Sequence, residues 1–330
     1  MKTIIVASIL AALAAPALAD GTELRIATLA PSGSTWSKKL AKASADINEK
    51  TEKRVSLKWY EGGSQGDEKD FVRKIGLGQL DGAAITSVGL SMIDESIRVL
   101  ELPGMFDSIE EMDYVAGKMW PKFKAAFEKK GYVLADRGDV GWFYILSKDK
   151  IESLKDLQGA KPWLWGDDKI VKALYGKLGV SGVPLGVPEV DAALTSGRIN
   201  ACYGSPLAAV ALQWATKVKY RTDVALFYGV GATVISKKAF DALDPKDQKT
   251  ILDRLAKSGN EIRKAVRQDN VDADKGMQRS GVKVTTISFK ADFQKAAEAT
   301  WNDLAGSVYT KDQLADVLKY RQEYRDKHKK

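Results

Sequence analysis

The alternation of apolar and polar residues in the first quarter of the chain predicts strands separated by helices. Residues 24–29 and 55–60 alternate with the two-residue period of a half-buried strand, and residues 80–85 form a short apolar run. A helix capped at Ser34 is expected to run through Ile47, and a second helix from Asp67 to about Gly76. This β-α-β-α-β order implies a parallel sheet with helices on its faces.

The same order of elements returns in the middle of the chain and predicts a second α/β lobe. The expected strands are residues 132–137, 140–147, 163–165 and 199–203, and the expected helical segments are residues 153–157, 168–178 and 190–195. The fold class predicted from this repeat is α/β with two lobes, in which mixed sheets are flanked by helices.

A helical pattern then runs from residue 244 to about residue 278 with few breakers. Asp244 is suited to cap this helix and Pro245 to occupy its first position. At 1.5 Å per residue the helix would reach roughly 50 Å. Because that length exceeds one small domain, the helix is expected to span both lobes.

The N-terminal segment predicts export from the cytoplasm. Lys2 precedes an apolar run over residues 4–15, and Ala17-Leu18-Ala19 supplies a small-residue cleavage site, so residues 1–19 are expected to be a cleavable signal peptide. No later stretch is apolar over the length that a membrane span needs, so the mature chain is not expected to be embedded in a membrane.

Composition excludes several classes of function. The net charge of +8 is spread over interleaved acids and bases, with one basic cluster at residues 325–330 that we interpret as a frayed, solvated end, so nucleic-acid binding is not expected. His328 is the single histidine and Cys202 the single cysteine. Because most nucleophilic catalysis and most transition-metal sites need histidine or several cysteines, we expect no enzyme activity, no metal and no cofactor.

The stretch "DLQGAKPWLWGDD" at residues 156–168 places two tryptophans on an expected strand. Residues two apart on a strand share a face, so Trp163 and Trp165 are expected to point the same way, with Leu164 opposite. A buried core position is the simplest interpretation for a tryptophan, and residues alone leave a core role and a ligand-pocket role both open.

Several segments, in this order and spacing, resemble the DctP-type solute-binding proteins of TRAP transporters. They are "TLAPSGSTW", "YEGGSQGDEKDFVRKIGLGQLDG", "LELPGMF", "SLKDLQGAK", "PEVDAALTSGRINACYGSPLAAVALQW" and "ISKKAFDALDPKDQKTIL", and the resemblance covers residues 24 to about 310. It implies a two-lobed periplasmic-binding-protein fold, a long shared helix and closure of the lobes on a ligand.

The resemblance also implies a division of the chain and a set of partners. The first lobe would comprise residues 20–139 plus about 226–262, and the second residues 140–225 plus about 263–330, with the ligand cleft between them. A protein of this kind acts in the periplasm, binds a small organic ligand and delivers it to the small and large subunits of a TRAP membrane permease.

At the positions where members of the family present polar anchors, this chain carries apolar residues. The family's carboxylate-binding arginine corresponds to Trp163, and a second arginine of the sialic-acid-type members corresponds to Phe143. An asparagine at the end of the first strand corresponds to Leu29, and another lies near Ser205. An acidic position at the start of the second helix is kept as Glu68 or Asp67.

These replacements predict an unusual ligand. Hydrogen bonds to a charged group contribute about 1.5 to 3 kcal/mol each, so losing a two-pronged arginine contact costs about 3 to 6 kcal/mol, or roughly two to four decades of affinity. We therefore expect an aromatic, hydrophobic or uncharged ligand held by aromatic faces. The residues expected to bind it are Leu29, Glu68, Thr86, Ser87, Phe143, Trp163, Trp165, Gly166, Val187, Tyr203 and Ser205.

Two alternatives remain open from the sequence. A carboxylate ligand could be bound by other donors, such as Arg137, Lys161, Ser87 or backbone amides near Gly166. The chain could also sense a ligand and report to a receptor without any role in transport.

Overall fold

The first lobe of the molecule is built on three parallel strands. The computed structural model describes residues 21–166 and 168–328, and the predicted signal peptide lies outside them. Strand β1 (Thr22–Thr28) pairs in parallel with both β2 (Val55–Tyr60) and β3 (Gly82–Thr86). Helices α1 (Thr35–Lys50) and α2 (Glu68–Gly76) connect them. The predicted β-α-β-α-β unit is thus confirmed.

Two antiparallel strands carry the sheet from the first lobe into the second. Strand β5 (Gly138–Ser147) pairs along most of its length with β9 (Tyr220–Ser236), and β9 also pairs antiparallel with β3. The eight-stranded sheet has the order β2-β1-β3-β9-β5-β8, with β4 (Tyr132–Leu134) and β10 (Lys283–Thr285) on β9. It is therefore a mixed sheet, as predicted. Strand β9 was not among the predicted strands, because its buried half lacks a two-residue alternation.

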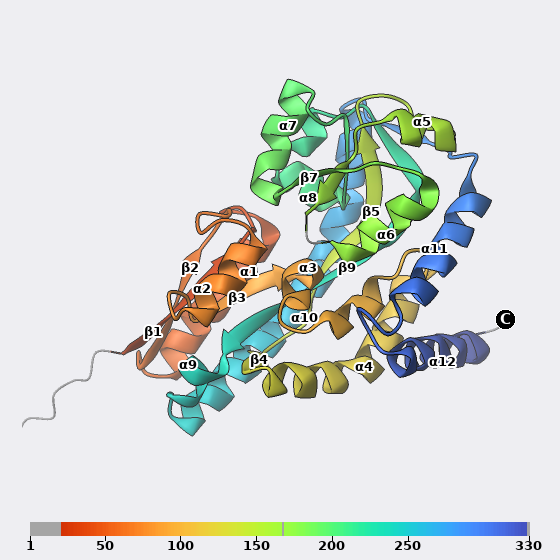
Figure 1. The fold of residues 1–330 in the computed structure, drawn as a ribbon. Helices are drawn as coiled ribbons and strands as arrows, with labels where there is room; N and C mark the ends of the chain where they lie inside the picture. The colour runs from red at the N-terminus through yellow and green to blue at the C-terminus, as the bar shows by residue number, and fades with distance from the viewer. Residues whose placement is uncertain (1–20, 167, 329–330) are drawn as a thin grey trace, which may run out of the picture.

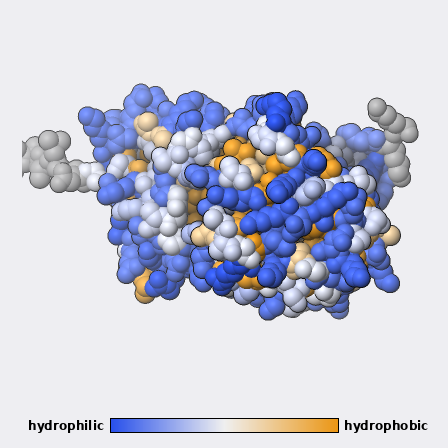
Figure 2. All heavy atoms as spheres, turned by 90° about the horizontal axis from the view of Figure 1, so that it is seen from above, coloured by the Kyte–Doolittle hydropathy of each residue, from blue (hydrophilic) through white to orange (hydrophobic). Residues whose placement is uncertain are grey.

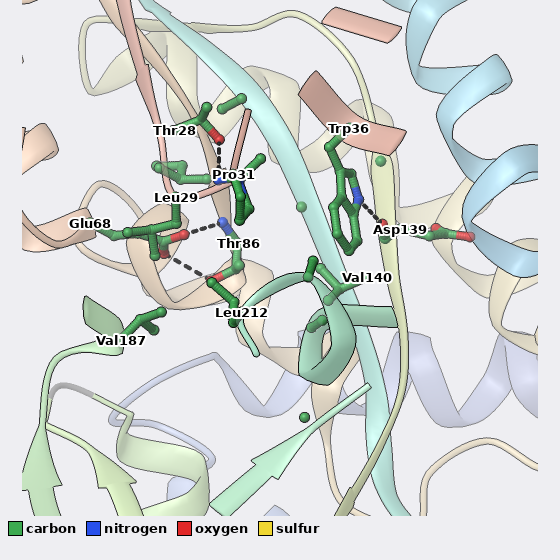
Figure 3. Close-up of a pocket in the computed structure, with 18 of the residues that line it drawn as sticks. Thr28, Leu29, Pro31, Trp36, Glu68, Thr86, Asp139, Val140, Val187 and Leu212 are labelled. Carbon is green, nitrogen blue, oxygen red and sulfur yellow. Dashed lines mark hydrogen bonds between the residues drawn. The ribbon is translucent and has the colours of Figure 1, made fainter. Parts of the chain in front are cut away.

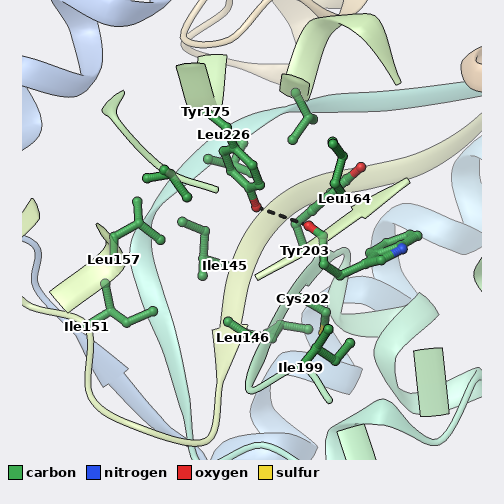
Figure 4. Close-up of a cluster of buried hydrophobic side chains, with 14 of the residues drawn as sticks. Ile145, Leu146, Ile151, Leu157, Leu164, Tyr175, Ile199, Cys202, Tyr203 and Leu226 are labelled. Atoms are coloured by element: carbon green, nitrogen blue, oxygen red, sulfur yellow. Dashed lines mark hydrogen bonds between the residues drawn. The ribbon is translucent and has the colours of Figure 1, made fainter. Parts of the chain in front are cut away.

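The second lobe surrounds a separate apolar core beside β5 and β8 (Ala201–Gly204) (Figure 4). A short parallel sheet of β6 (Trp163–Trp165) and β7 (Val183–Leu185) lies next to it. Its helices are α5 (Leu154–Gly159), α6 (Lys169–Leu178), α7 (Val190–Ser196) and α8 (Pro206–Ala211). The strand and helix predictions for residues 153–203 are confirmed to within a few residues.

Helix α10 (Pro245–Arg279) runs along both lobes, as its pattern predicts (Figure 1). Its 35 residues contact α1 in the first lobe and β5 and α8 in the second. The carboxylate of Asp244 accepts a hydrogen bond from the Lys246 amide at 2.8 Å, and Pro245 is the first helical residue. The predicted lobe boundaries fall inside β5, β9 and α10, and this division of the chain stays a prediction.

The remaining helices are α3 (Ser87–Ser91), the 3-10 helix η1 (Glu95–Glu101), α4 (Ile109–Lys129), α9 (Lys237–Asp241), α11 (Lys290–Leu304) and α12 (Lys311–His328), with the single turns η2 (Val187–Glu189) and η3 (Trp214–Thr216). Among them, α4 and α12 lie at the bottom of the molecule and α11 at its right in Figure 1. Helix α12 packs on α4, where Arg325 pairs with Asp107 and Glu111. The expectation of a frayed basic end is therefore wrong for Arg325.

Polar and charged side chains cover most of the face seen from above, and apolar groups show in gaps between them (Figure 2). Among the residues that the structure describes, no helix combines the length and the apolar composition needed to cross a membrane.

The close approach of α10 to the start of β5 yields a stability prediction. A Cβ added at Gly259 would lie 2.7 Å from the Arg137 carbonyl oxygen and 3.0 Å from the Asp136 Cβ. Gly259→Ala is therefore expected to lower the free energy of unfolding by about 1–3 kcal/mol through overpacking. Chemical denaturation measures this.

The matched control lies in the same helix. At Gly276 an added Cβ would meet only a terminal nitrogen of Arg279, at 3.9 Å. Gly276→Ala should leave stability unchanged or raise it by about 0.5–1 kcal/mol, because alanine costs less backbone entropy in a helix. Equal effects of the two substitutions would contradict tight packing at Gly259.

Candidate ligand-binding site

A cavity of about 150 Å³ lies between the two lobes. The first lobe contributes the segment after β1, the start of α2 and the end of β3. The second lobe contributes β5, β6, the start of η2, β8 and the α8–η3 segment. Cavities at the carboxyl ends of parallel strands and between lobes are the usual place for small-molecule sites.

Eight of the eleven residues expected to bind ligand line this cavity. They are Leu29, Glu68, Thr86, Phe143, Trp163, Trp165, Val187 and Tyr203. They come from segments as far apart in sequence as the end of β1 and β8, so the fold brings distant positions together. Figure 3 labels four of them, Leu29, Glu68, Thr86 and Val187. Contact of the eight residues with a ligand stays a prediction.

The other three expected residues lie outside the lining. The Ser87 hydroxyl is bound to the Glu101 carboxylate and accepts a hydrogen bond from Arg98 at 2.6 Å. The buried Ser205 caps α8, where its hydroxyl accepts from the Ala208 amide. Gly166 is exposed in the turn after β6. Ser87 and Ser205 thus have local partners that occupy their hydroxyl groups.

Trp163 is both a core residue and part of the cavity wall. Its side chain is only 1 % exposed, and its indole N–H donates to the Leu185 carbonyl at 2.9 Å. The indole stacks on Tyr203, with ring centroids 4.7 Å apart and planes 21° apart. Much of the ring surface that we expected to cover a ligand is therefore already in contact with protein.

The second tryptophan of the motif joins the two lobes. Trp165 stacks on Trp163 at 5.7 Å, which confirms that the two rings share a face of β6. Its indole N–H donates at 2.9 Å to the carboxylate of Asp67, the N-cap residue of α2. The same oxygen accepts from the Val187 amide at 3.4 Å. Burial raises the pKa of Asp67 even though these donors favour its charged form.

A buried guanidinium lies behind the aromatic wall, but it is fully engaged. Arg98 donates to Asp168 at 2.6 Å and to Glu101 at 3.0 Å. Tyr203 also donates its hydroxyl to Asp168, at 3.3 Å. Arg98 does not line the cavity. Its contact with Asp168, the cap of α6, forms a second polar link between the lobes.

Within the described part of the chain, the cavity lining contains no lysine, arginine or histidine. It contains three acidic residues, Glu68, Asp136 and Asp139. Asp139 pairs with Arg267 on α10 and accepts from Tyr228 at 2.7 Å. The lining therefore lacks the positive charge that would hold a carboxylate.

Glu68 lies beside Leu29 and Thr86 in the cavity lining (Figure 3). Its carboxylate accepts from the Thr86 amide and hydroxyl, both at 2.8 Å, and from the Gly89 amide at 2.7 Å. Burial nevertheless raises the pKa of Glu68 to about 8. Burial likewise raises the pKa of Asp136 to about 6, although Thr233 donates two hydrogen bonds to it. Glu68 is thus mostly neutral at pH 7.

The side-chain donors proposed for a carboxylate do not line the cavity. Arg137 pairs with Asp113 on α4, and Lys161 is exposed on the segment before β6. Ser87 and Gly166 are also outside the lining, whereas Trp165, next to Gly166, lines the cavity, so binding by backbone amides near Gly166 stays an alternative.

The lining also contains apolar residues that were not predicted from the sequence, including Trp36, Leu40, Leu212 and Trp214. Trp36 donates its indole N–H to the Asp139 carbonyl at 3.0 Å, and Trp214 packs edge-on against Trp163 at 5.4 Å. The position of Trp36, just after the carboxyl end of the first strand, is a signal that could have identified it.

Solved structures of known solute-binding proteins share this fold. A TRAP periplasmic solute-binding protein of Xanthobacter autotrophicus Py2, solved with β-D-galacturonate, matches with a TM-score of 0.84 at 23 % identity, over 91 % of this chain and 99 % of that one. DctP7 of Bordetella pertussis, described as an extracytoplasmic solute receptor binding pyroglutamic acid, matches with a TM-score of 0.85 at 18 % identity, over 92 % and 100 %.

Sequence comparison places the chain in a family. A protein of Chromohalobacter salexigens described as a solute-binding protein is 25 % identical over 267 residues, which are 78 % of this chain and 77 % of that protein. Residues 26–307 match the family described as "Bacterial extracellular solute-binding protein, family 7", or DctP. The chain therefore belongs to the DctP family of extracytoplasmic solute-binding proteins of TRAP transporters.

Proposed function

We propose that this protein captures a small, uncharged aromatic or apolar molecule between its lobes and delivers it to the small and large subunits of a TRAP permease. As a DctP-family protein it binds a solute and is not an enzyme. The proposal places it in the periplasm after removal of residues 1–19. The observation that carries the ligand class is an interlobe cavity walled by aromatic rings without a cation among its described lining residues.

The size of the cavity supports a ligand built on a single ring. A dry apolar cavity of about 150 Å³ in another protein accepts benzene. The cavity between these lobes has about the same volume, with Leu29, Val187, Leu212 and the aromatic wall around it. Burial of an aromatic ring there gains roughly 25 cal/mol per Å² of apolar surface removed from water.

The charges of the lining support an uncharged ligand. A carboxylate brought into this cavity would lose its hydration, find no cation among the described lining residues and meet the carboxylate of Asp136. Glu68 is mostly neutral at pH 7, since burial raises its pKa to about 8, so it adds little charge to the cavity and does not require a cationic ligand.

The rival proposal is a carboxylate ligand, and the similar solved structures favour it. The proteins of Xanthobacter autotrophicus and Bordetella pertussis were solved with galacturonate and pyroglutamic acid, which are carboxylic acids. For this chain to bind such a ligand, the cavity would have to admit a cationic donor that its described lining does not contain.

Direct measurement of the ligand separates the two proposals. Protein purified gently from its native periplasm and then denatured is expected to release an uncharged aromatic or apolar compound, detected by mass spectrometry. Calorimetry on refolded protein should show binding of toluene or a similar single-ring compound and none of galacturonate, pyroglutamate or succinate. Tight binding of any of these acids would refute the ligand class.

Trp163→Arg tests whether this position determines the ligand class. A guanidinium at this buried site lacks a partner and should lower the free energy of unfolding by about 3 kcal/mol or more. A carboxylate ligand would supply the missing partner, so galacturonate or succinate should raise the melting temperature of this variant and leave the wild type unchanged. Trp163→Leu, which removes the ring without adding charge, should respond to neither acid.

Glu68 yields a prediction about pH. Its folded pKa of about 8 lies above the usual value of 4.5, so the folded state binds more protons than the unfolded state between these values. Stability should fall as the pH rises through this range, by up to about 1.4 kcal/mol per unit from this group. Chemical denaturation between pH 6 and 8 measures this slope. The window is chosen because it lies above the pKa of Asp136, which is about 6.

Glu68→Gln should flatten this slope between pH 6 and 8, because the amide cannot ionise. The variant is also expected to lose some stability at pH 5, since the amide nitrogen cannot accept from Gly89 or Thr86. A wild-type slope that survives the substitution would show that another group carries the pH dependence.

A further inference from the structure

We propose that Gly229 on β9 is a specificity-determining residue, which limits the size of the ligand by fixing the position of the Phe143 ring. Gly229 does not line the cavity itself. This proposal rests on the proposed function for its ligand class, because the Phe143 ring borders the same cavity. It adds the upper limit of ligand size and the residue that sets it.

The ring of Phe143 occupies the space that a side chain at position 229 would need. Phe143 pairs with Phe227 in the β5–β9 register, so Gly229 is its diagonal cross-strand neighbour. A Cβ built on Gly229 would lie 2.3 Å from Cε2, 2.9 Å from Cδ2 and 3.1 Å from Cζ of Phe143. Three atoms of one rigid ring are involved, so rotation of a flexible chain end cannot relieve the clash.

The backbone does not require glycine at this position. Gly229 is absent from the glycines with positive φ, so alanine could adopt its backbone conformation without strain. The nearest neighbours of an added Cβ are all ring atoms of Phe143. The effect of a side chain here can therefore be attributed to the ring.

We expect the Phe143 ring to yield toward the cavity, which it lines. Phe143 is stacked on Phe227, with centroids 4.9 Å apart and planes 24° apart, and it lies against Tyr203 at 6.3 Å. It separates the cavity from a small void of about 10 Å³, and Gly229 lines this void. A methyl group at position 229 would enter from the void and push the ring toward the ligand.

A graded series of alkylbenzenes tests this assignment by calorimetry. The series is benzene, toluene, ethylbenzene and propylbenzene. Gly229→Ala should weaken binding of the largest of these compounds that the wild type accepts by about tenfold, and it should weaken benzene binding much less. Phe143→Ala should extend the series toward larger compounds. In the Phe143→Ala background, Gly229→Ala should change affinity less than twofold, since the clash is gone.

A structural readout makes the test independent of the ligand class. In a crystal structure of ligand-free Gly229→Ala, the Phe143 ring should be displaced toward the cavity relative to its position in the ligand-free wild type. The cavity of the variant should be correspondingly smaller. Gly117→Ala on α4, where an added Cβ meets nothing within 4 Å, is the matched control and should leave cavity and affinities unchanged. Thermal melts report whether each variant folds.

The possible outcomes separate the two proposals. If the wild type binds none of the four alkylbenzenes, the ligand class is refuted, and the crystal structures still decide the role of Gly229. A Phe143 ring that stays in place in Gly229→Ala would overturn the assignment. If Gly229→Ala weakens binding equally in the wild-type and Phe143→Ala backgrounds, the assignment is overturned as well.

Discussion

The stacked contact between Trp163 and Tyr203 is the interaction on which the cavity depends. These rings come from β6 and β8, and both side chains are almost completely buried. Trp163 is fixed further by its hydrogen bond to Leu185, and Tyr203 by its hydroxyl on Asp168. The wall is thus built from rings that protein contacts hold in place, and in the function proposed above a ligand would fit against this apolar surface with little ordering of side chains.

The sequence predicted individual strands and helices better than it predicted which strands pair with one another. Local signals were sufficient for β1, β2 and α10, because alternation, capping by Asp244 and the proline that follows it act within a few residues. Strand β9 was not predicted, since residues 226–235 are buried on both faces and show no period. Its antiparallel pairing with β3 and β5 depends on contacts distant in sequence, which no local pattern contains.

The candidate site was likewise predicted only in part, because some of its contacts join residues that are distant in the sequence. The resemblance identified Trp163, Phe143 and Leu29 as cavity positions, and all three line the cavity. Ser87 and Ser205 lie outside the lining, where the Ser87 hydroxyl contacts Glu101 and the Ser205 hydroxyl caps α8. The stacking that occupies the ring of Trp163 was not predicted, because it joins residues 40 positions apart.

Closure of the lobes rests on contacts that the protein supplies itself. Asp67 accepts from Trp165, and Arg98 pairs with Asp168, so these two polar links across the lobes join protein groups. The guanidinium of Arg98 is thereby engaged in holding the lobes together. In the function proposed above, a ligand needs no charge to bridge the lobes and contributes mainly by filling the apolar space between them. On that proposal, selection among ligands follows from the size and shape of this space, which the rings of Phe143 and Trp163 line.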